Sequence, residues 1–243
     1  MPKHNKQRII LIDLLRGLAI ALMFIYHFCF DLDYFGYVQF QFSSDPFWLN
    51  FRALIVSLFL GVVGFSLFLA HQGHWNRQAW LKRLSWLVLA SLAVSISSYL
   101  MYPKTFIFFG ILHFIALASL LGVVFIRFGY LNLVLGALIL LIGNHYSHAF
   151  FDQPAWQWFG LMTEKPSTED YVPLFPWFGM VLLGLGLAYW TQNNQTLNRL
   201  LHWQNSHRAV SSLCFAGRHS LLIYLLHQPI FLGLLYVVTM LIR

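Results

Sequence analysis

The chain has 243 residues, of which 59% are hydrophobic, 18% are aromatic and only 9% are charged. A soluble globular domain carries about 25% charged residues, so this composition argues against a soluble enzyme, a nucleic-acid binder, a disordered chain and a disulfide-stapled module. The formal net charge is +7, but the basic residues lie in short stretches beside apolar segments, without interleaved aromatic residues. Charge and composition together predict a helical membrane protein that is surrounded by lipid and has no nucleic-acid partner.

Seven apolar segments follow one another along the chain, most of them near the roughly 20 residues that a membrane-spanning helix requires. They are Ile9–Phe30, Phe47–Ala70, Leu84–Met101, Phe106–Ile126, Leu131–Gly143, Leu174–Tyr189 and Leu221–Ile242. The fifth and sixth are short, and no internal repeat or linker separates the segments. We therefore predict an all-α fold, a polytopic membrane bundle of about seven transmembrane helices, formed by a single domain over residues 1–243.

Lysine and arginine in short connections mark the cytoplasmic side of a membrane protein. Here most of them fall at the N-terminus and in every second connection, at Lys3, Lys6, Arg8, Arg77, Lys82, Arg83, Arg127, Arg199, Arg208 and Arg218. No small-residue cleavage site follows the basic N-terminus, so the first apolar segment is predicted to be a retained helix. The alternation predicts a cytoplasmic N-terminus and an outer location for the longest connection, from about Asn144 to Val172.

The connection from Asn144 to Val172 is rich in aromatic and polar residues, which predicts a partly ordered cap over the outer face. Within it, His145 and His148 have the i, i+3 spacing of neighbours on a helix, and this spacing suits two ligands of a metal ion. The pattern offers no third ligand. We therefore predict no metal site.

Ionisable residues interrupt the first apolar segment, where each costs a few kcal/mol and is a candidate functional group. Eleven residues span about three helical turns, so Arg16 and His27 share a face and lie roughly 16 Å apart. Asp13 and Asp31 fall near the same stripe. The stripe is predicted to face the bundle interior or a watery cavity; the alternative for Asp13 and Arg16 is an ion pair at the cytoplasmic interface.

Histidines also interrupt two later segments. His113 lies in the sequence FFGILHF, and His227 follows Ser220 and Tyr224 with the spacing of one helical stripe. Pro229 comes two residues later and removes a backbone hydrogen bond there. A histidine in an apolar helix often only hydrogen-bonds a neighbouring helix, but three on separate helices of one bundle predict that at least one lines a functional cavity.

Five stretches of the sequence resemble one known family. They are LIDLLRGLAIALMFIYHFCFDL, FWLNFRALIVSLFLGVVGFSLFLA, FIFFGILHFIALASLLG, DYVPLFPWFGMVLLGLG and GRHSLLIYLLHQP. Together they are similar to the bacterial branch of the heparan-alpha-glucosaminide N-acetyltransferase catalytic-domain family, which belongs to the transmembrane acyltransferases. The resemblance implies transfer of an acyl group from cytosolic acyl-CoA, with acetyl-CoA as the expected donor, to a sugar or glycan acceptor across the membrane. It also implies a multi-pass protein of the bacterial cytoplasmic (inner) membrane.

Arg16 and His27 also resemble the Arg/His pair in the first helix of the broader acyltransferase-3 families. This implies that His27 is the catalytic base, which Asp31 is expected to orient, and that Arg16 with Asp13 serves the acyl-CoA side. In the lysosomal members an Asn occupies the position of His27 and the catalytic His lies further on, before a Trp, whereas SSDPFWLN here contains Asp45 and no His. Either His27 takes over the chemistry or this branch does something different.

Further candidates accompany this core set. Asp45, Arg52, His113, Tyr224 and His227 are candidates for binding the acceptor or for hydrogen-bonding the thioester oxygen as negative charge develops on it. The loop cations Arg77, Lys82, Arg83, Arg208 and Arg218 are candidates for the CoA phosphates, although topology alone explains them. Direct transfer and an acyl-histidine intermediate both fit the pattern, and a homo-oligomer is compatible with it.

Two other functions fit parts of the pattern. His113 paired with His227 or His27 can supply axial haem ligands for electron transfer. A seven-helix bundle can also be a small-molecule transporter or a lipid-interacting scaffold. Secondary transporters often show paired halves, which this sequence lacks.

Overall fold

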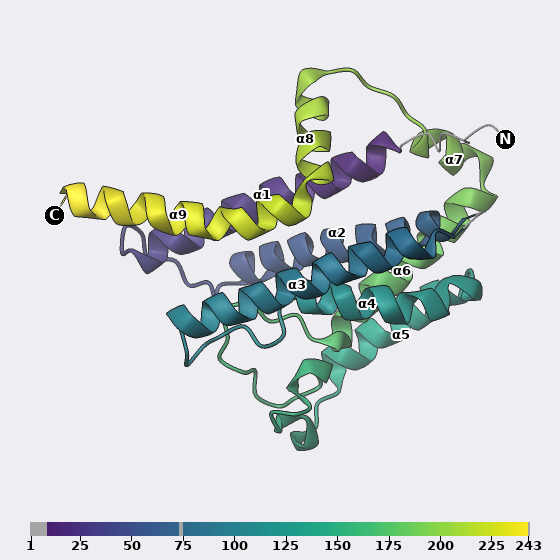
Figure 1. Ribbon diagram of the computed structural model, residues 1–243. Helices are drawn as coiled ribbons and strands as arrows, with labels where there is room; N and C mark the ends of the chain where they lie inside the picture. The colour runs from purple at the N-terminus through teal and green to yellow at the C-terminus, as the bar shows by residue number, and fades with distance from the viewer. Residues whose placement is uncertain (1–8, 73–74, 243) are drawn as a thin grey trace. The chain divides into compact units, whose positions relative to one another are not determined.

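A computed structural model describes residues 9–72 and 75–242, and every regular element in this part of the chain is helical (Figure 1). The α-helices are α1 (Ile10–Tyr34), α2 (Pro46–His71), α3 (Arg77–Met101), α4 (Ile111–Phe125), α5 (Leu131–His145), α6 (Leu174–Asn193), α7 (Gln195–Leu201), α8 (Arg208–Arg218) and α9 (Ser220–Ile242). Short 3₁₀ turns are η1 (Ile126–Phe128), η2 (Ala149–Asp152) and η3 (Gln157–Phe159). Lys3, Lys6 and Arg8 lie outside the described residues.

Each of the seven predicted apolar segments contains a helix, so the predicted all-α membrane bundle is confirmed. Within the described residues, six helices are long and apolar enough to cross a membrane: α1, α2, α3, α4 together with η1, α6 and α9. The seventh, α5, has 15 residues and is short, as its sequence predicts. The chain is a multi-pass membrane protein.

The start of α4 differs from the prediction. The apolar residues from Phe106 onward suggest a helix, but α4 begins at Ile111. The backbone before it is held by partners outside a helix: the Ile107 N–H donates to Ser98 Oγ and the Phe109 carbonyl accepts from Val172 N–H. Hydrogen bonds to distant residues therefore override the local preference for helix.

The connection between α6 and α9 also holds more structure than predicted, because α7 and α8 form within it. Asn194 caps α7 by accepting from the backbone N–H groups of Thr196 and Leu197. In α8 the small or apolar residues Cys214 and Gly217 are buried, while Arg208 and Phe215 are exposed. One face of α8 is thus buried against the protein.

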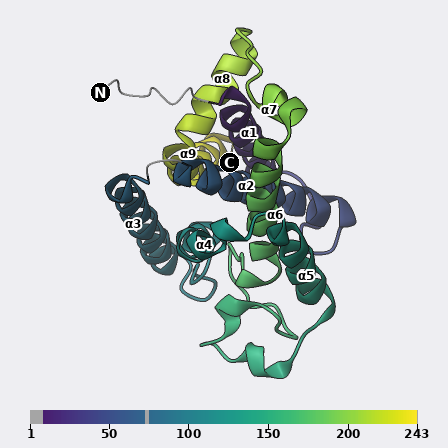
Figure 2. The same cartoon turned by 90° about the vertical axis from the view of Figure 1, so that its right-hand side faces the viewer.

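Two compact units divide the chain. The terminal unit contains the described residues up to Phe59 and from Asn194 onward, and the middle unit runs from Leu60 to Asn193. In the terminal unit α1 runs beside α9 and is crossed by α8 (Figure 1). In the middle unit α6 packs along α5, and α4 contacts both α3 and α6 (Figure 2).

The core of the terminal unit is largely aromatic. Ile20, Met23 and Tyr26 of α1 pack with Phe42 and Trp48 in one buried cluster. Phe42 and Trp48 have ring centroids 4.4 Å apart, and the Tyr26 ring meets Trp48 edge-on at 5.9 Å. This cluster occupies the part of α1 that carries His27, so it fixes the position of that stretch of helix.

Candidate active site

Two histidines from opposite ends of the sequence meet where α1 packs against α9. The ring centroids of His27 and His227 are 4.8 Å apart, and the ring planes are inclined at 64°. His27 is half-buried, and His227 is 5% exposed. Of the three histidines predicted to lie within apolar helices, the structure thus brings two together in the terminal unit.

Aromatic rings enclose this histidine pair. Phe24, Tyr224 and Phe231 lie with their ring centroids 5.7, 5.5 and 6.0 Å from that of His227. Tyr26 meets the His27 ring edge-on at 5.7 Å. These apolar surroundings offer little solvation, so a charge on either imidazole depends on the few polar groups nearby.

The two ring nitrogens of His227 have different surroundings. Nδ1 forms a hydrogen bond with the backbone carbonyl of Tyr224. Because a carbonyl can only accept, Nδ1 carries the proton and Nε2 carries the lone pair in the neutral ring. Nε2 is buried and has no hydrogen-bond partner among the described residues.

Asp31 is nearly inaccessible, with 1% of its surface exposed, and lies one helical turn beyond His27. Its Oδ1 accepts a hydrogen bond from Gln228 Nε2 at 2.7 Å. No hydrogen bond joins Asp31 to His27 in the part of the chain that the structure describes, in contrast to the expected orienting role. The remaining oxygens, Asp31 Oδ2 and Gln228 Oε1, are buried without a partner among these residues.

Gln228 is the polar residue at this site that the sequence analysis missed. It follows His227 directly and is half-buried within α9. The signal for it was an amide side chain inside an apolar segment, since such groups seek partners on neighbouring helices. The pairing with Asp31 itself joins segments far apart in sequence and could not be predicted from local spacing.

Among the described residues, neither Asp45 nor Arg52 forms a hydrogen bond with the histidine pair. Asp45 Oδ1 accepts from the Phe47 N–H at 2.8 Å, so this carboxylate caps the start of α2. Arg52 is exposed and its guanidinium lies beside the Tyr26 hydroxyl. The structure gives Asp45 a structural partner and leaves Arg52 accessible at the edge of the aromatic cluster.

The other end of α1 carries the predicted pair of Asp13 and Arg16. Arg16 Nη1 and Asp13 Oδ1 are 3.5 Å apart, which confirms the ion pair. Arg16 is half-buried, whereas the loop cations occupy exposed positions on α3 and α8, at Arg77, Lys82, Arg83, Arg208 and Arg218. Arg16 therefore differs from these other candidates in being partly shielded from solvent.

His113 lies in the middle unit and both of its ring nitrogens are engaged. Ser95 Oγ donates to the Ile107 carbonyl at 2.6 Å, so it accepts from His113 Nε2 at 3.0 Å. Nδ1 accepts from the Gly110 N–H at 3.3 Å. With neither nitrogen left for a substrate, this geometry favours a capping role for His113 at the start of α4.

Asp170 completes that cap, because its Oδ2 accepts from the Ile111 N–H at 2.8 Å. Two segments noted for their family resemblance, GILH and DYVPLFPWFG, therefore meet at one helix terminus.

We expect Asp170→Ala to lower the free energy of unfolding by about 0.5–2 kcal/mol, because it removes a helix cap. Thermal unfolding in detergent measures this loss of stability. Glu164→Ala is the control, since the exposed Glu164 carboxyl makes no such bond. Equal melting temperatures for the two variants would contradict the capping role of Asp170.

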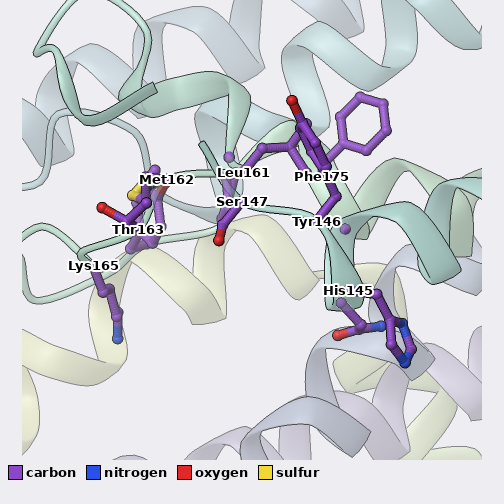
Figure 3. Close-up of a pocket in the computed structure, with 13 residues that line it drawn as sticks. His145, Tyr146, Ser147, Leu161, Met162, Thr163, Lys165 and Phe175 are labelled. Carbon is purple, nitrogen blue, oxygen red and sulfur yellow. Dashed lines mark hydrogen bonds between the residues drawn. The ribbon is translucent and has the colours of Figure 1, made fainter. Parts of the chain in front are cut away.

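The loop between α5 and α6 contains the short turns η2 and η3 and forms an open pocket of about 360 Å³ in the middle unit. Figure 3 shows Met162, Thr163 and Lys165 on one side of it and His145 on the other. Tyr146, Tyr171 and Phe175 add aromatic surface. Polar and aromatic groups thus share an open cavity in the loop predicted to lie outside the membrane.

The helical spacing predicted for His145 and His148 is wrong. α5 ends at His145, and His148 is extended and accepts from the Phe150 N–H. Within the described residues, no group of three or more His, Cys, Asp or Glu side chains is arranged to hold a metal ion.

Two titratable groups of this loop are strongly influenced by their neighbours. Hydrogen bonds from the side chain and backbone of Thr163 lower the pKa of Asp152. Burial raises the pKa of Tyr171, whose hydroxyl donates to the Gln157 carbonyl at 2.6 Å. Asp152 is thus held as a carboxylate that fastens the loop, and Tyr171 as a neutral phenol.

The geometry of the histidine pair does not suit a haem. Axial imidazoles bind iron from opposite faces of the macrocycle and direct their nitrogens toward each other across it, with metal–nitrogen bonds of about 2 Å. The His27 and His227 rings instead meet edge to face, with centroids 4.8 Å apart. A macrocycle has no room between rings in this arrangement.

Comparison with known families places the geometry in context. Residues 8–229 match the family described as "Heparan-alpha-glucosaminide N-acetyltransferase, catalytic". The match covers most of the chain and includes α1, with Arg16 and His27, as well as His227 and Gln228 of α9. No curated protein and no solved structure matches the chain.

Proposed function

We propose that the chain, which belongs to the heparan-alpha-glucosaminide N-acetyltransferase catalytic family and is a membrane acetyltransferase, transfers an acyl group from acyl-CoA to a sugar or glycan. The simplest such group is acetyl. The single observation that carries the proposal is the imidazole pair of His27 and His227, in which the buried Nε2 of His227 has no hydrogen-bond partner among the described residues. Acyl transfer needs a proton acceptor next to the attacking atom. An imidazole with a free nitrogen provides it.

We assign the donor to the cytoplasmic end of α1. Arg16 is half-buried and held by Asp13, so its guanidinium is positioned to meet a phosphate of CoA. Roughly 16 Å of helix separates Arg16 from His27, a distance comparable with the length of a pantetheine arm. The thioester would then reach the histidine pair while the nucleotide stays at the cytoplasmic end.

We place the acceptor on the opposite side, in the bacterial cytoplasmic membrane, with the N-terminus cytoplasmic. The distribution of Lys and Arg along the chain supports this orientation. In that orientation the loop between α5 and α6 lies outside, and its open pocket of polar and aromatic side chains offers a surface for a sugar.

The test uses the purified full chain in lipid nanodiscs with acetyl-CoA. We expect saturable binding of acetyl-CoA and release of the CoA thiol, which increases when glucosamine or glucose is added; mass spectrometry of the product distinguishes an amide from an ester. A wild-type chain that neither binds acetyl-CoA nor releases thiol would refute the proposal.

A variant of Arg16 tests the donor assignment. Arg16→Gln is expected to raise KM for acetyl-CoA about 10- to 150-fold, because a charge-assisted hydrogen bond to a phosphate contributes about 1.5–3 kcal/mol. Arg127→Gln is the matched control, since it removes an exposed cation from η1. If both variants change KM equally, general electrostatic attraction rather than a defined phosphate contact is responsible.

A further inference from the structure

We infer that His227 of α9, and not His27 of α1, removes the proton from the attacking group of the acceptor. This inference rests on the proposed function and specifies which member of the histidine pair performs its central step. It reverses the assignment that the first helix alone suggests. Three observations carry it: the fixed tautomer of His227, the burial of its Nε2, and the position of the second imidazole.

The tautomer of His227 is fixed by its own helix. Nδ1 donates to the Tyr224 carbonyl, so the lone pair resides on Nε2. His27 has no hydrogen bond to either ring nitrogen among the described residues, so nothing there selects one of its tautomers. A base whose lone pair already lies on Nε2 needs no change of tautomer before that nitrogen accepts a proton.

A bond from Nδ1 to a carbonyl of the same helix is not unusual here, because His71, His145, His202 and His219 each bond the carbonyl four residues earlier. The neighbouring imidazole distinguishes His227 from these residues. Its Nε2 is shielded from solvent, and a second imidazole lies 4.8 Å from its ring. Of these other residues, His145, His202 and His219 are exposed. His71 Nε2 is also buried without a partner among the described residues, but the ring packs against Trp75 and not against a second imidazole.

His27 then serves as the neutral partner of His227. Two imidazolium ions with centroids 4.8 Å apart would repel each other strongly in apolar surroundings. At most one of the two rings is therefore positively charged at a time, and a neutral His27 lets His227 accept the additional proton. Asp31 lies one helical turn beyond His27 and accepts a hydrogen bond from Gln228. It is a buried carboxyl group in the same unit as the histidine pair.

The step balances without any further reactant. The hydroxyl or amine of the acceptor attacks the thioester carbon while its proton passes to His227 Nε2. The carbon–sulfur bond then breaks, the CoA thiolate leaves, and it takes the proton back from the imidazolium. The products are the acylated acceptor and free CoA thiol, and His227 returns to its starting state.

Chemical rescue tests the assignment. We expect His227→Ala to lower kcat for thiol release about 10²–10⁴-fold with little change in acetyl-CoA binding, and added imidazole to restore part of the rate, since the lost ring leaves a space of its own size. His27→Ala is expected to lose about tenfold and to gain nothing from imidazole. His202→Ala is the control for a histidine with the same local bond and an exposed ring, and it should match wild type.

The outcomes separate this inference from the proposed function. If wild type releases thiol but His227→Ala keeps its rate, or if imidazole rescues His27→Ala or fails to rescue His227→Ala, the inference is overturned and the acyltransferase remains. If wild type itself is inactive, the proposed function fails first. Should His227→Ala not purify as a single species, His227→Gln replaces it, because glutamine fills the space and cannot accept the proton; a kcat within threefold of wild type would then overturn the inference.

Discussion

Replacing His27 and His227 together with glutamine is expected to lower acyl transfer about 10²–10⁴-fold, no further than His227→Gln alone. Groups that act as one unit are strongly non-additive, because removing the base already removes the step that its partner supports. The measurement is kcat for thiol release from acetyl-CoA in nanodiscs, for the two single variants and the double variant. The rings are 4.8 Å apart, close enough for such coupling.

Glutamine is chosen because it preserves side-chain volume and polarity while it cannot be protonated near neutral pH. The matched control is His202→Gln with His219→Gln, two exposed rings that make the same kind of carbonyl bond. Acetyl-CoA binding should persist in both double variants. If the losses of His27→Gln and His227→Gln instead multiply in the double variant, the two imidazoles act independently.

The helices could largely be predicted because their signal is local. Every predicted apolar segment contains a helix, and the stripe of Arg16 and His27 follows from helical periodicity alone. The exceptions occur where distant residues compete. Phe106–Gly110 looks helical by composition, but Ser98 and Val172 hold its backbone in another conformation.

The candidate site was predictable in its members and not in its pairings. His27, Asp31 and His227 stand out as ionisable groups in apolar helices, which a sequence reveals directly. Spacing along α1 suggested that Asp31 serves His27, whereas the carboxylate bonds Gln228 of α9. A partner on another helix depends on how helices pack, and no one-dimensional pattern encodes it.

His113 shows the same limit in the opposite direction. As a lone histidine in an apolar segment, His113 is a candidate for a hydrogen bond to the thioester oxygen. In the structure, however, both of its ring nitrogens bond other residues, Ser95 and Gly110. The type of residue was correctly noticed, and only its hydrogen-bond partners separate a structural role from a chemical one.

Packing of α8 on α1 is expected to fail when a single methyl group is added at Gly217. The two backbones touch there: a Cβ at Gly217 would lie 2.0 Å from the Asp13 carbonyl oxygen, and a Cβ at Gly17 would lie 1.9 Å from that of Leu213. Backbone atoms cannot move aside as side chains do, so the helices must separate. We expect Gly217→Ala to lower the free energy of unfolding by about 1–3 kcal/mol or more.

Gly233→Ala is the matched control, because it makes the same substitution in α9 with no atom within 4 Å of the added Cβ. Helix propensity alone should make that variant as stable as wild type or more so, by up to about 1 kcal/mol. Opposite signs in thermal unfolding therefore separate a steric effect from propensity. Since α8 crosses α1 beside Asp13 and Arg16, Gly217→Ala should also raise KM for acetyl-CoA. If Gly217→Ala and Gly233→Ala instead melt at the same temperature, α1 and α8 are not in close contact in the membrane.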